Sequence, residues 1–284
     1  MSRDLLRLAL VRSLSMTNLW GLRANALRKV VGLFLKGGRA QVLKGFCPVC
    51  GKRPAVFLGS PRSVRESYWC LNCCSSTRNR HVAYTILRLF TGGGGSLVEW
   101  ARHKRPRLTL WHLQAQGPLH WALKSLDGYV GTEYLPNRPS GATLCGIRIE
   151  DATGSTFRDA SFDLVISEDV LEHVVRPRDA LREIRRVLRE GGSHVFSVPL
   201  HEGTTEWWDG RVVPFEYHSD PLGGRAAVFT RFGKSDICRI LEREGFEAEL
   251  DEVEIPEYGI RQTTVILARK KSKDEMEKSV EGIE

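Results

Sequence analysis

Residues 162–199 read FDLVISEDVLEHVVRPRDALREIRRVLREGGSHVFSVP, and this stretch decides the fold of the chain. Its first part, 162–167, is nearly continuously apolar, which is typical of a strand buried on both faces of a sheet. Apolar residues at helical spacing follow over 177–189, and Gly191-Gly192 ends the predicted helix. Residues 194–198 are the next apolar run. A strand, a helix and another strand in this order predict a parallel β-α-β unit.

The same alternation continues on both sides of this stretch. Strands are predicted at 107–113, 129–135, 146–150, 248–255 and 263–268, and helices at 119–126 and 234–244. The last two strands resemble a closing hairpin, and residues 199–233 are predicted to be a long loop. We therefore expect residues 97–270 to form one α/β domain, with a mainly parallel sheet covered by helices on both faces. The charged residues 271–284 are predicted to be a disordered tail.

Charge divides the chain of 284 residues, whose net charge is +8, into two parts. Residues 1–98 contain 16 Lys and Arg against two acidic residues, whereas the remainder has 26 basic and 32 acidic residues. A basic front part could contact nucleic-acid phosphate or an anionic membrane surface, or it could be a solvated face. Residues 1–44 are predicted to be basic, amphipathic and helical, with helices at 3–14 and 18–35. Three readings stay open for 1–36: a targeting segment, a membrane-surface helix, or helices that pack on the main domain.

Four cysteines form two C-x2-C pairs, Cys47 with Cys50 and Cys70 with Cys73. Two such turns can place four thiolates around one ion, so residues 45–91 are predicted to be a structural zinc module with a following helix at 77–90. Cys74 directly follows a ligand and could substitute for Cys73. Residues 91–96 (TGGGGS) are predicted to be a flexible joint.

The cysteine usage also bears on location. Clustered cysteines and the lack of a secretory signal in this sequence favour a reducing, cytoplasmic setting. Its apolar runs are shorter than the roughly 20 residues that cross a bilayer, so no transmembrane segment is predicted.

Acidic residues recur where successive predicted strands end. Glu133 ends the strand at 129–135, Asp151 and Ala152 follow the strand at 146–150, and Ser167 and Glu168 end the strand at 162–167. The carboxyl ends of parallel strands share one edge of a sheet, where ligands bind. A carboxylate such as that of Glu133 can accept hydrogen bonds from both hydroxyls of a ribose, and Asp151 could accept one from an adenine amino group.

The 162–174 segment, followed by Pro177 and residues 180–199, resembles the type 11 domain of class I S-adenosylmethionine-dependent methyltransferases. The resemblance covers about 105–270 and implies a Rossmann-like fold that binds S-adenosylmethionine. It places Glu133 on the ribose, Asp151 near the adenine, and the Ser167–Glu168 turn beside the methionine portion. The cysteine pairs followed by RNRH (78–81) also resemble a zinc-bearing subgroup of bacterial methyltransferase-like proteins.

The first turn of the predicted domain departs from the family pattern. It reads WHLQAQGP (111–118), so His112 stands about where an acid is expected and only Gly117 remains of the usual glycines. Gln114 and Gln116 could still hydrogen-bond the carboxylate or amine of the methionine. A catalytically decayed protein, acting as a zinc-stapled module that binds nucleic acid or a partner, is therefore the alternative to an active methyltransferase.

The long segment after the fifth strand carries the candidate residues for chemistry on the methyl acceptor. It combines aromatic, acidic and histidine side chains, with PFEYHSDP at 214–221. Segments of this length at a ligand-binding edge often cover a substrate. His218 is the predicted general base, needed only where the acceptor must lose a proton. The sequence does not identify the acceptor, because domains of this type keep a cofactor half and vary the substrate side.

Overall fold

The computed structural model describes residues 40–104, 107–210, 213–219, 225–272 and 275. The predicted helices at 3–14 and 18–35, and nearly all of the predicted tail, lie outside these residues. Contacts divide the chain into two compact units. Unit 1 comprises residues 1–107, 114–131 and 251–265, and unit 2 comprises residues 108–113, 132–250 and 266–284. No helix among the described residues is long and apolar enough to cross a membrane.

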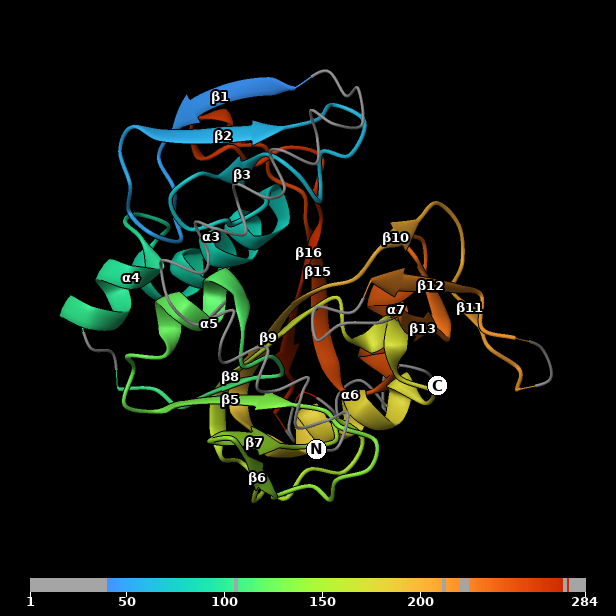
Figure 1. The fold of residues 1–284 in the computed structure, drawn as a ribbon. Helices are drawn as coiled ribbons and strands as arrows, with labels where there is room; N and C mark the ends of the chain where they lie inside the picture. Colours follow the sequence, from blue (N-terminus) through green and yellow to red (C-terminus); the bar gives the residue numbers. More distant parts are fainter. Residues whose placement is uncertain (1–39, 105–106, 211–212, 220–224, 273–274, 276–284) are drawn as a thin grey trace. The chain divides into compact units, whose positions relative to one another are not determined.

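Unit 1 contains a small antiparallel sheet and the helices that follow it in the chain (Figure 1). Its sheet has the order β1-β2-β3, with strands β1 (Gln41–Gly45), β2 (Ala55–Gly59) and β3 (Trp69–Cys70). Its helical elements are α3 (Thr77–Thr91), α4 (Leu97–Glu99), the π-helical turn η1 (Trp100–Lys104), α5 (Gly117–Leu123) and the 3-10 turn η3 (Pro256–Tyr258).

The ends of α3 explain its length. Ser76 caps the first turn by accepting a hydrogen bond from the Asn79 backbone nitrogen, and the Asn79 side chain accepts one from Ser76 in return. Gly92 ends the helix in the left-handed conformation, with φ of 79°. The segment predicted to be a flexible joint thus contains the end of α3, and Ser96 caps α4.

Unit 2 is built on an eight-stranded mixed sheet with the order β15-β16-β9-β8-β4-β5-β7-β6. Strands β4 to β8 are β4 (Leu110–His112), β5 (Tyr129–Glu133), β6 (Thr143–Leu144), β7 (Ile147–Ile149) and β8 (Phe162–Glu168). The remaining strands are β9 (Leu188–Ser197), β15 (Phe246–Asp251) and β16 (Val265–Lys270). The pairs β4–β8, β5–β7 and β8–β9 are parallel, whereas β16–β9 and β6–β7 are antiparallel.

The strand order makes the predicted Rossmann-like fold explicit. In chain order the five strands β4, β5, β7, β8 and β9 are arranged 3-2-1-4-5, and the order reverses between β4 and β8. The antiparallel β16 lies between β9 and β15, so the predicted closing pair enters the sheet out of chain order. The Rossmann-like fold class is therefore confirmed.

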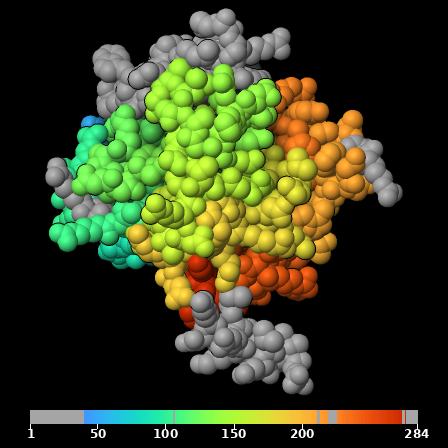
Figure 2. Space-filling model, turned by 90° about the horizontal axis from the view of Figure 1, so that it is seen from below, coloured from blue at the N-terminus to red at the C-terminus, as the bar shows by residue number. Residues whose placement is uncertain are grey.

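The helices of unit 2 are α6 (Pro177–Val187), α7 (Ile237–Arg243) and the 3-10 turn η2 (Leu171–His173). Apolar residues of α6, among them Leu181 and Ile184, are buried. Arg186 of α6 binds Asp159 and the Phe157 carbonyl in the segment after β7. Figure 2 shows the surface on the side of the β5, β6 and β7 region, coloured green.

Several predicted boundaries differ from the structure by a few residues, and two of the differences have a clear cause. The predicted helix at 177–189 ends at Val187, because Leu188 already enters β9 and pairs with Phe162. The predicted long loop after β9 contains five short strands, β10 (Leu200–His201), β11 (Glu206–Trp207), β12 (Glu216–Ser219), β13 (Arg225–Val228) and β14 (Thr230–Gly233). These form the small sheets β10-β14-β11 and β12-β13. Strands of two to four residues carry too little periodicity to be recognised from the sequence.

Candidate functional site

The four predicted cysteine ligands come together in unit 1. Candidate ligand atoms of Cys47, Cys50, Cys70 and Cys73 all lie within 4.8 Å of one another. The Sγ atoms of Cys47 and Cys73 are 3.7 Å apart, and those of Cys50 and Cys70 are 4.0 Å apart. Sulfur atoms around a tetrahedral zinc are separated by about 3.8 Å, because each Zn–S bond is about 2.3 Å long. The donor set and its spacing therefore fit zinc.

The electrostatics of the cysteine cluster also favour a cation. Burial acts to raise the pKa of Cys47, but hydrogen bonds from the other three thiols and the charge of Arg80 hold that pKa well below its usual value. In the same cluster, burial and hydrogen bonds with the neighbouring cysteines raise the pKa of Cys73 well above its usual value. Four adjacent thiols cannot all ionise unless a cation compensates their charge. Cys74 is not a member of the cluster, and its backbone has φ of 61°.

The basic residues after the cysteines are engaged within unit 1. Arg80 is fully buried and donates hydrogen bonds to the carbonyls of Tyr68, Ser75, Tyr258 and Gly259 at 2.7–2.8 Å. Its guanidinium lies 4.1 Å from the centre of the Phe57 ring. His81 is also fully buried, and Arg88 lies 2.9 Å from Asp251. These side chains therefore stabilise the unit through internal contacts.

In unit 2, a cavity of about 500 Å³ opens at the carboxyl ends of four neighbouring strands. We call it the strand-end cavity. It is lined by residues at or just after the ends of β4, β5, β7 and β8, including Trp111, Leu113, Thr132, Tyr134, Asp151, Ala152, Val170 and His173. The order of the strands reverses between β4 and β8, so the cavity lies at the position where sheets of this kind bind ligands. Its volume is within the range of small-molecule sites.

Asp151 is the best-positioned acid in this cavity. Its backbone follows β7, and its Oδ1 accepts hydrogen bonds from the backbone nitrogen and the hydroxyl of Thr153 at 2.8 and 2.7 Å. Oδ2 accepts none of the hydrogen bonds found among the described residues. The neighbouring Glu150 is instead occupied by Arg148 and Thr156. The turn therefore fixes Asp151 while one of its carboxylate oxygens stays available to a ligand.

Glu133 lies at the same end of the neighbouring strand. It pairs in register with Ile149, and its carbonyl accepts a hydrogen bond from Glu150, so the carboxyl ends of β5 and β7 coincide. Thr132 and Tyr134 line the strand-end cavity, whereas Glu133 is buried and is not among the lining residues. Successive side chains of a strand point to opposite faces, which accounts for this alternation.

Ser167 and Glu168 end β8 as predicted, and both are buried. The Ser167 hydroxyl is 2.9 Å from Nε2 of His194 on β9. Glu168 Oε2 is 3.5 Å from Nε2 of His112 on β4. Neither Ser167 nor Glu168 lines the strand-end cavity. The histidine that replaces the expected acid in the first turn thus faces a carboxylate from the next strand of the sheet.

The predicted cofactor residues of the first turn, Gln114, Gln116 and Gly117, belong to unit 1. Gln116 precedes α5, and its buried Oε1 has no hydrogen-bond partner in the described part of the chain. Gly117 has φ of 84°, and a Cβ built on it would meet nothing within 4 Å. No side chain or backbone atom of the described residues therefore crowds the backbone at Gly117. The Oε1 atom of Gln116 is an acceptor for a ligand that donates a hydrogen bond.

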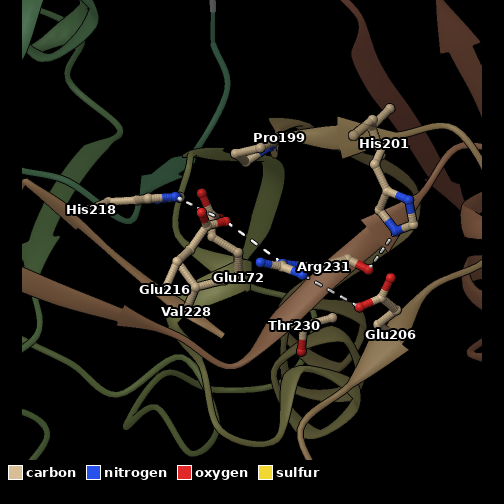
Figure 3. Close-up of a pocket in the computed structure, with 10 residues that line it drawn as sticks. Glu172, Pro199, His201, Glu206, Glu216, His218, Val228, Thr230 and Arg231 are labelled. Atoms are coloured by element: carbon tan, nitrogen blue, oxygen red, sulfur yellow. Dashed lines mark hydrogen bonds and ion pairs between the residues drawn. The ribbon is translucent and has the colours of Figure 1, made fainter. Parts of the chain in front are cut away.

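A second cavity of unit 2, of about 370 Å³, contains the predicted base His218 (Figure 3). We call it the small-sheet cavity, because β10 to β14 supply most of its wall. It is lined by Glu172, Pro199, Leu200, His201, Glu206, Glu216, His218, Val228, Thr230 and Arg231. His218 Nε2 is 3.7 Å from Glu216 Oε1, and Arg231 lies between Glu206 and Glu216 at 3.7 and 3.8 Å.

The two cavities of unit 2 share a wall. Glu172 lines the small-sheet cavity, and the next residue, His173, lines the strand-end cavity. Likewise, Val228 and Thr230 line the small-sheet cavity, whereas Phe229 between them lines the strand-end cavity. Sequence reasoning missed Glu172, His173 and Arg231. The adjacent Glu172-His173 pair, directly after the acidic end of β8, was the available signal.

Comparison with known proteins supports the class of protein that the fold and the strand-end cavity indicate. Residues 131–196 match a family model described as a methyltransferase domain. The segment covers β5 to β9, and therefore three of the four strand ends around the strand-end cavity. The predicted resemblance to the type 11 methyltransferase domain is thereby confirmed for this part of the chain. No curated protein matches the chain.

The solved structures to which this chain is similar include three methyltransferases of low sequence identity. One is the Burkholderia thailandensis 1,6-didemethyltoxoflavin-N1-methyltransferase with bound 1,6-didemethyltoxoflavin and S-adenosylhomocysteine, which is 15% identical with a TM-score of 0.43, over 69% of this chain and 79% of that one. Another is an S-adenosylmethionine-dependent methyltransferase from Methanosarcina mazei, at 18% identity and a TM-score of 0.37 over 60% and 97%. A third is a putative methyltransferase in complex with the Haloferax volcanii Trm112 methyltransferase activator. It is 17% identical with a TM-score of 0.38, over 61% of this chain and 91% of that one.

Proposed function

We propose that this chain is an S-adenosylmethionine-dependent methyltransferase that binds its cofactor in the strand-end cavity and carries a structural zinc on its four cysteines. The observation that carries the proposal is the cavity of about 500 Å³ at the switch point of the sheet, with Asp151 fixed on its wall. The matched methyltransferase domain surrounds most of this cavity.

The contacts expected for the cofactor follow from the lining. An adenine amino group donates hydrogen bonds, and Asp151 Oδ2 is the available acceptor beside Ala152. Tyr134 is exposed and supplies aromatic surface for the nucleoside, whereas the Trp111 indole is fully buried behind the cavity, where it hydrogen-bonds Thr132 at 2.9 Å. Glu133 does not line this cavity, so its predicted contact with the ribose stays a prediction on which the cofactor proposal does not depend.

The small-sheet cavity is proposed to receive the methyl acceptor. S-adenosylmethionine, when bound, supplies an electrophilic methyl group, and the protein contributes alignment and exclusion of water. His218 lines this cavity, and its Nε2 is 3.7 Å from the Glu216 carboxylate. His218 is the candidate to take a proton from an acceptor hydroxyl or amine.

Calorimetric titration with S-adenosylhomocysteine tests the cofactor proposal on the zinc-loaded full chain. Asp151→Asn is the sharpest variant, because it keeps Oδ1 for the Thr153 turn and replaces Oδ2 with an amino group that cannot accept a hydrogen bond. Loss of a hydrogen bond to a charged group costs roughly 1.5–3 kcal/mol, so we expect Kd to rise about 10- to 100-fold.

Asp159→Asn is the matched control, because Asp159 is highly exposed and binds Arg186 outside the cavity. Its Kd should equal that of the wild type. A folded, zinc-loaded wild type that binds no S-adenosylhomocysteine at millimolar concentration would refute the cofactor proposal. That result would leave the alternative of a non-catalytic binding module.

A further inference from the structure

Three side chains that meet between the two cavities of unit 2 form a second group of potential metal ligands. Candidate ligand atoms of Glu172, His173 and His218 all lie within 4.8 Å of one another. Glu172 is buried, whereas the two histidines are partly exposed. This group and the cysteine cluster are the two such groups in the part of the chain that the structure describes. We propose that Glu172, His173 and His218 bind a divalent transition-metal ion.

Backbone contacts hold the three ligands together. Glu172 and His173 belong to the turn η2, and His218 belongs to β12, which pairs with β13. The Glu172 carbonyl accepts a hydrogen bond from the Phe229 backbone nitrogen at 2.8 Å. Phe229 directly follows β13, so this hydrogen bond fixes β13 beside η2. The pairing of β12 with β13 then places His218 next to Glu172 and His173. The two histidine rings consequently lie 5.1 Å apart, edge to face.

The orientation of the His173 ring suits metal binding. Its Nδ1 is 2.8 Å from the Ala227 carbonyl, which can only accept a hydrogen bond, so Nδ1 carries the proton. The lone pair is then on Nε2, which lies 3.8 Å from Glu172 Oε1. Metal-binding histidines commonly donate the other ring N–H to a carbonyl or carboxylate in this way. His173 therefore has the tautomer that a metal requires.

The donor set indicates the class of metal. Two imidazoles and one carboxylate bind zinc in catalytic sites and non-haem iron in oxygenases, with coordination positions left open. Ligand atoms around a tetrahedral ion lie about 3.3 Å apart, because the metal–ligand bonds are about 2.0 Å long. Side-chain shifts of about 0.5 Å would close the 3.8 Å separation of Glu172 and His173 around one ion.

The open positions of this ion would face the small-sheet cavity. Glu172 and His218 both line that cavity, and Figure 3 shows their side chains converging on its wall. An oxygen atom of the acceptor could complete the coordination, and the cation would lower the pKa of an acceptor hydroxyl. His218 would then act as a ligand instead of taking the proton itself. Only this assignment to the acceptor rests on the proposed methyltransferase function.

Titration of the full chain with Mn²⁺, followed by the loss of the free-ion signal in electron paramagnetic resonance, tests the site. Mn²⁺ favours oxygen ligands over thiolates, so a chain loaded with zinc at its cysteines reports the second site. We expect one Mn²⁺ per wild-type chain, and binding at least about tenfold weaker in His218→Ala, as expected when a coordinating group is lost. In a separate experiment without Mn²⁺, wild type saturated with zinc at both sites should contain one more zinc equivalent by mass spectrometry than His218→Ala treated in the same way.

His201→Ala is the matched control, because His201 lines the same cavity but contacts backbone carbonyls of Glu202 and Arg231. It should bind Mn²⁺ as the wild type does. Glu172→Gln, checked for folding by circular dichroism, should lose the ion as His218→Ala does. Absence of Mn²⁺ and zinc binding beyond the cysteines at millimolar metal, or equal affinities of His218→Ala and His201→Ala, would overturn the site. S-adenosylhomocysteine binding by these variants separates this failure from failure of the cofactor proposal.

Discussion

Replacing Arg80 with methionine should strongly destabilise unit 1. The guanidinium is fully buried and donates to four backbone carbonyls at 2.7–2.8 Å, two before α3 and two in the segment around η3. Methionine keeps an apolar stem beside Phe57 but removes every donor, so four carbonyls lose a hydrogen bond at once.

The magnitude follows from these contacts. Each hydrogen bond to a charged group contributes roughly 1.5–3 kcal/mol, and the contributions of one side chain are not additive. Removing one partner from a buried charged network typically costs about 3–5 kcal/mol, so we expect a loss of about 4 kcal/mol. At about 2–4 °C per kcal/mol for a chain of this size, Tm should fall by roughly 8–16 °C.

Thermal and denaturant unfolding of the zinc-loaded chain measure this effect. Arg80→Lys should be intermediate, because one ammonium group keeps the charge but cannot reach four carbonyls. Arg53→Met is the control, since Arg53 is 67% exposed and its ion pair with Glu257 should contribute little. A change below about 1 kcal/mol in Arg80→Met would refute the conclusion that Arg80 stabilises the unit.

Two further outcomes are expected from the described contacts. Burial lowers the pKa of His194 to about 3, so between its ordinary value near 6.5 and pH 3 the unfolded chain binds a proton that the folded chain does not. Stability should therefore decrease as the pH falls through this range, and His194→Gln should flatten the dependence by up to about 1.4 kcal/mol per pH unit in urea titrations; parallel curves would contradict it. Cys73→Ser should lower the zinc content and the Tm, whereas Cys74→Ser should leave zinc content unchanged, because Cys74 lies outside the cluster; equal zinc loss in both variants would disprove the assignment.

The candidate sites differ in how far the sequence could predict them. The spacing of the cysteine pairs was sufficient for the cluster, because each C-x2-C turn places its two thiolates locally. Asp151 was predicted from its position after a strand, and the structure adds the Thr153 turn that fixes it. The alternation that leaves Glu133 off the cavity wall could not be inferred, since it depends on which face of β5 borders the cavity.

The sequence by itself determined the order of the main strands and helices of unit 2, their mainly parallel α/β arrangement and the four cysteines. These follow from hydrophobic periodicity and short-range spacing, which are local properties of the chain. The tertiary structure decided what distant segments do together. Arg80 joins the cysteine region to residues 258–259, and His218 meets Glu172 and His173 through a sheet of very short strands. These long-range contacts depend on strand pairing and burial between remote segments, which leave no periodic pattern in the sequence.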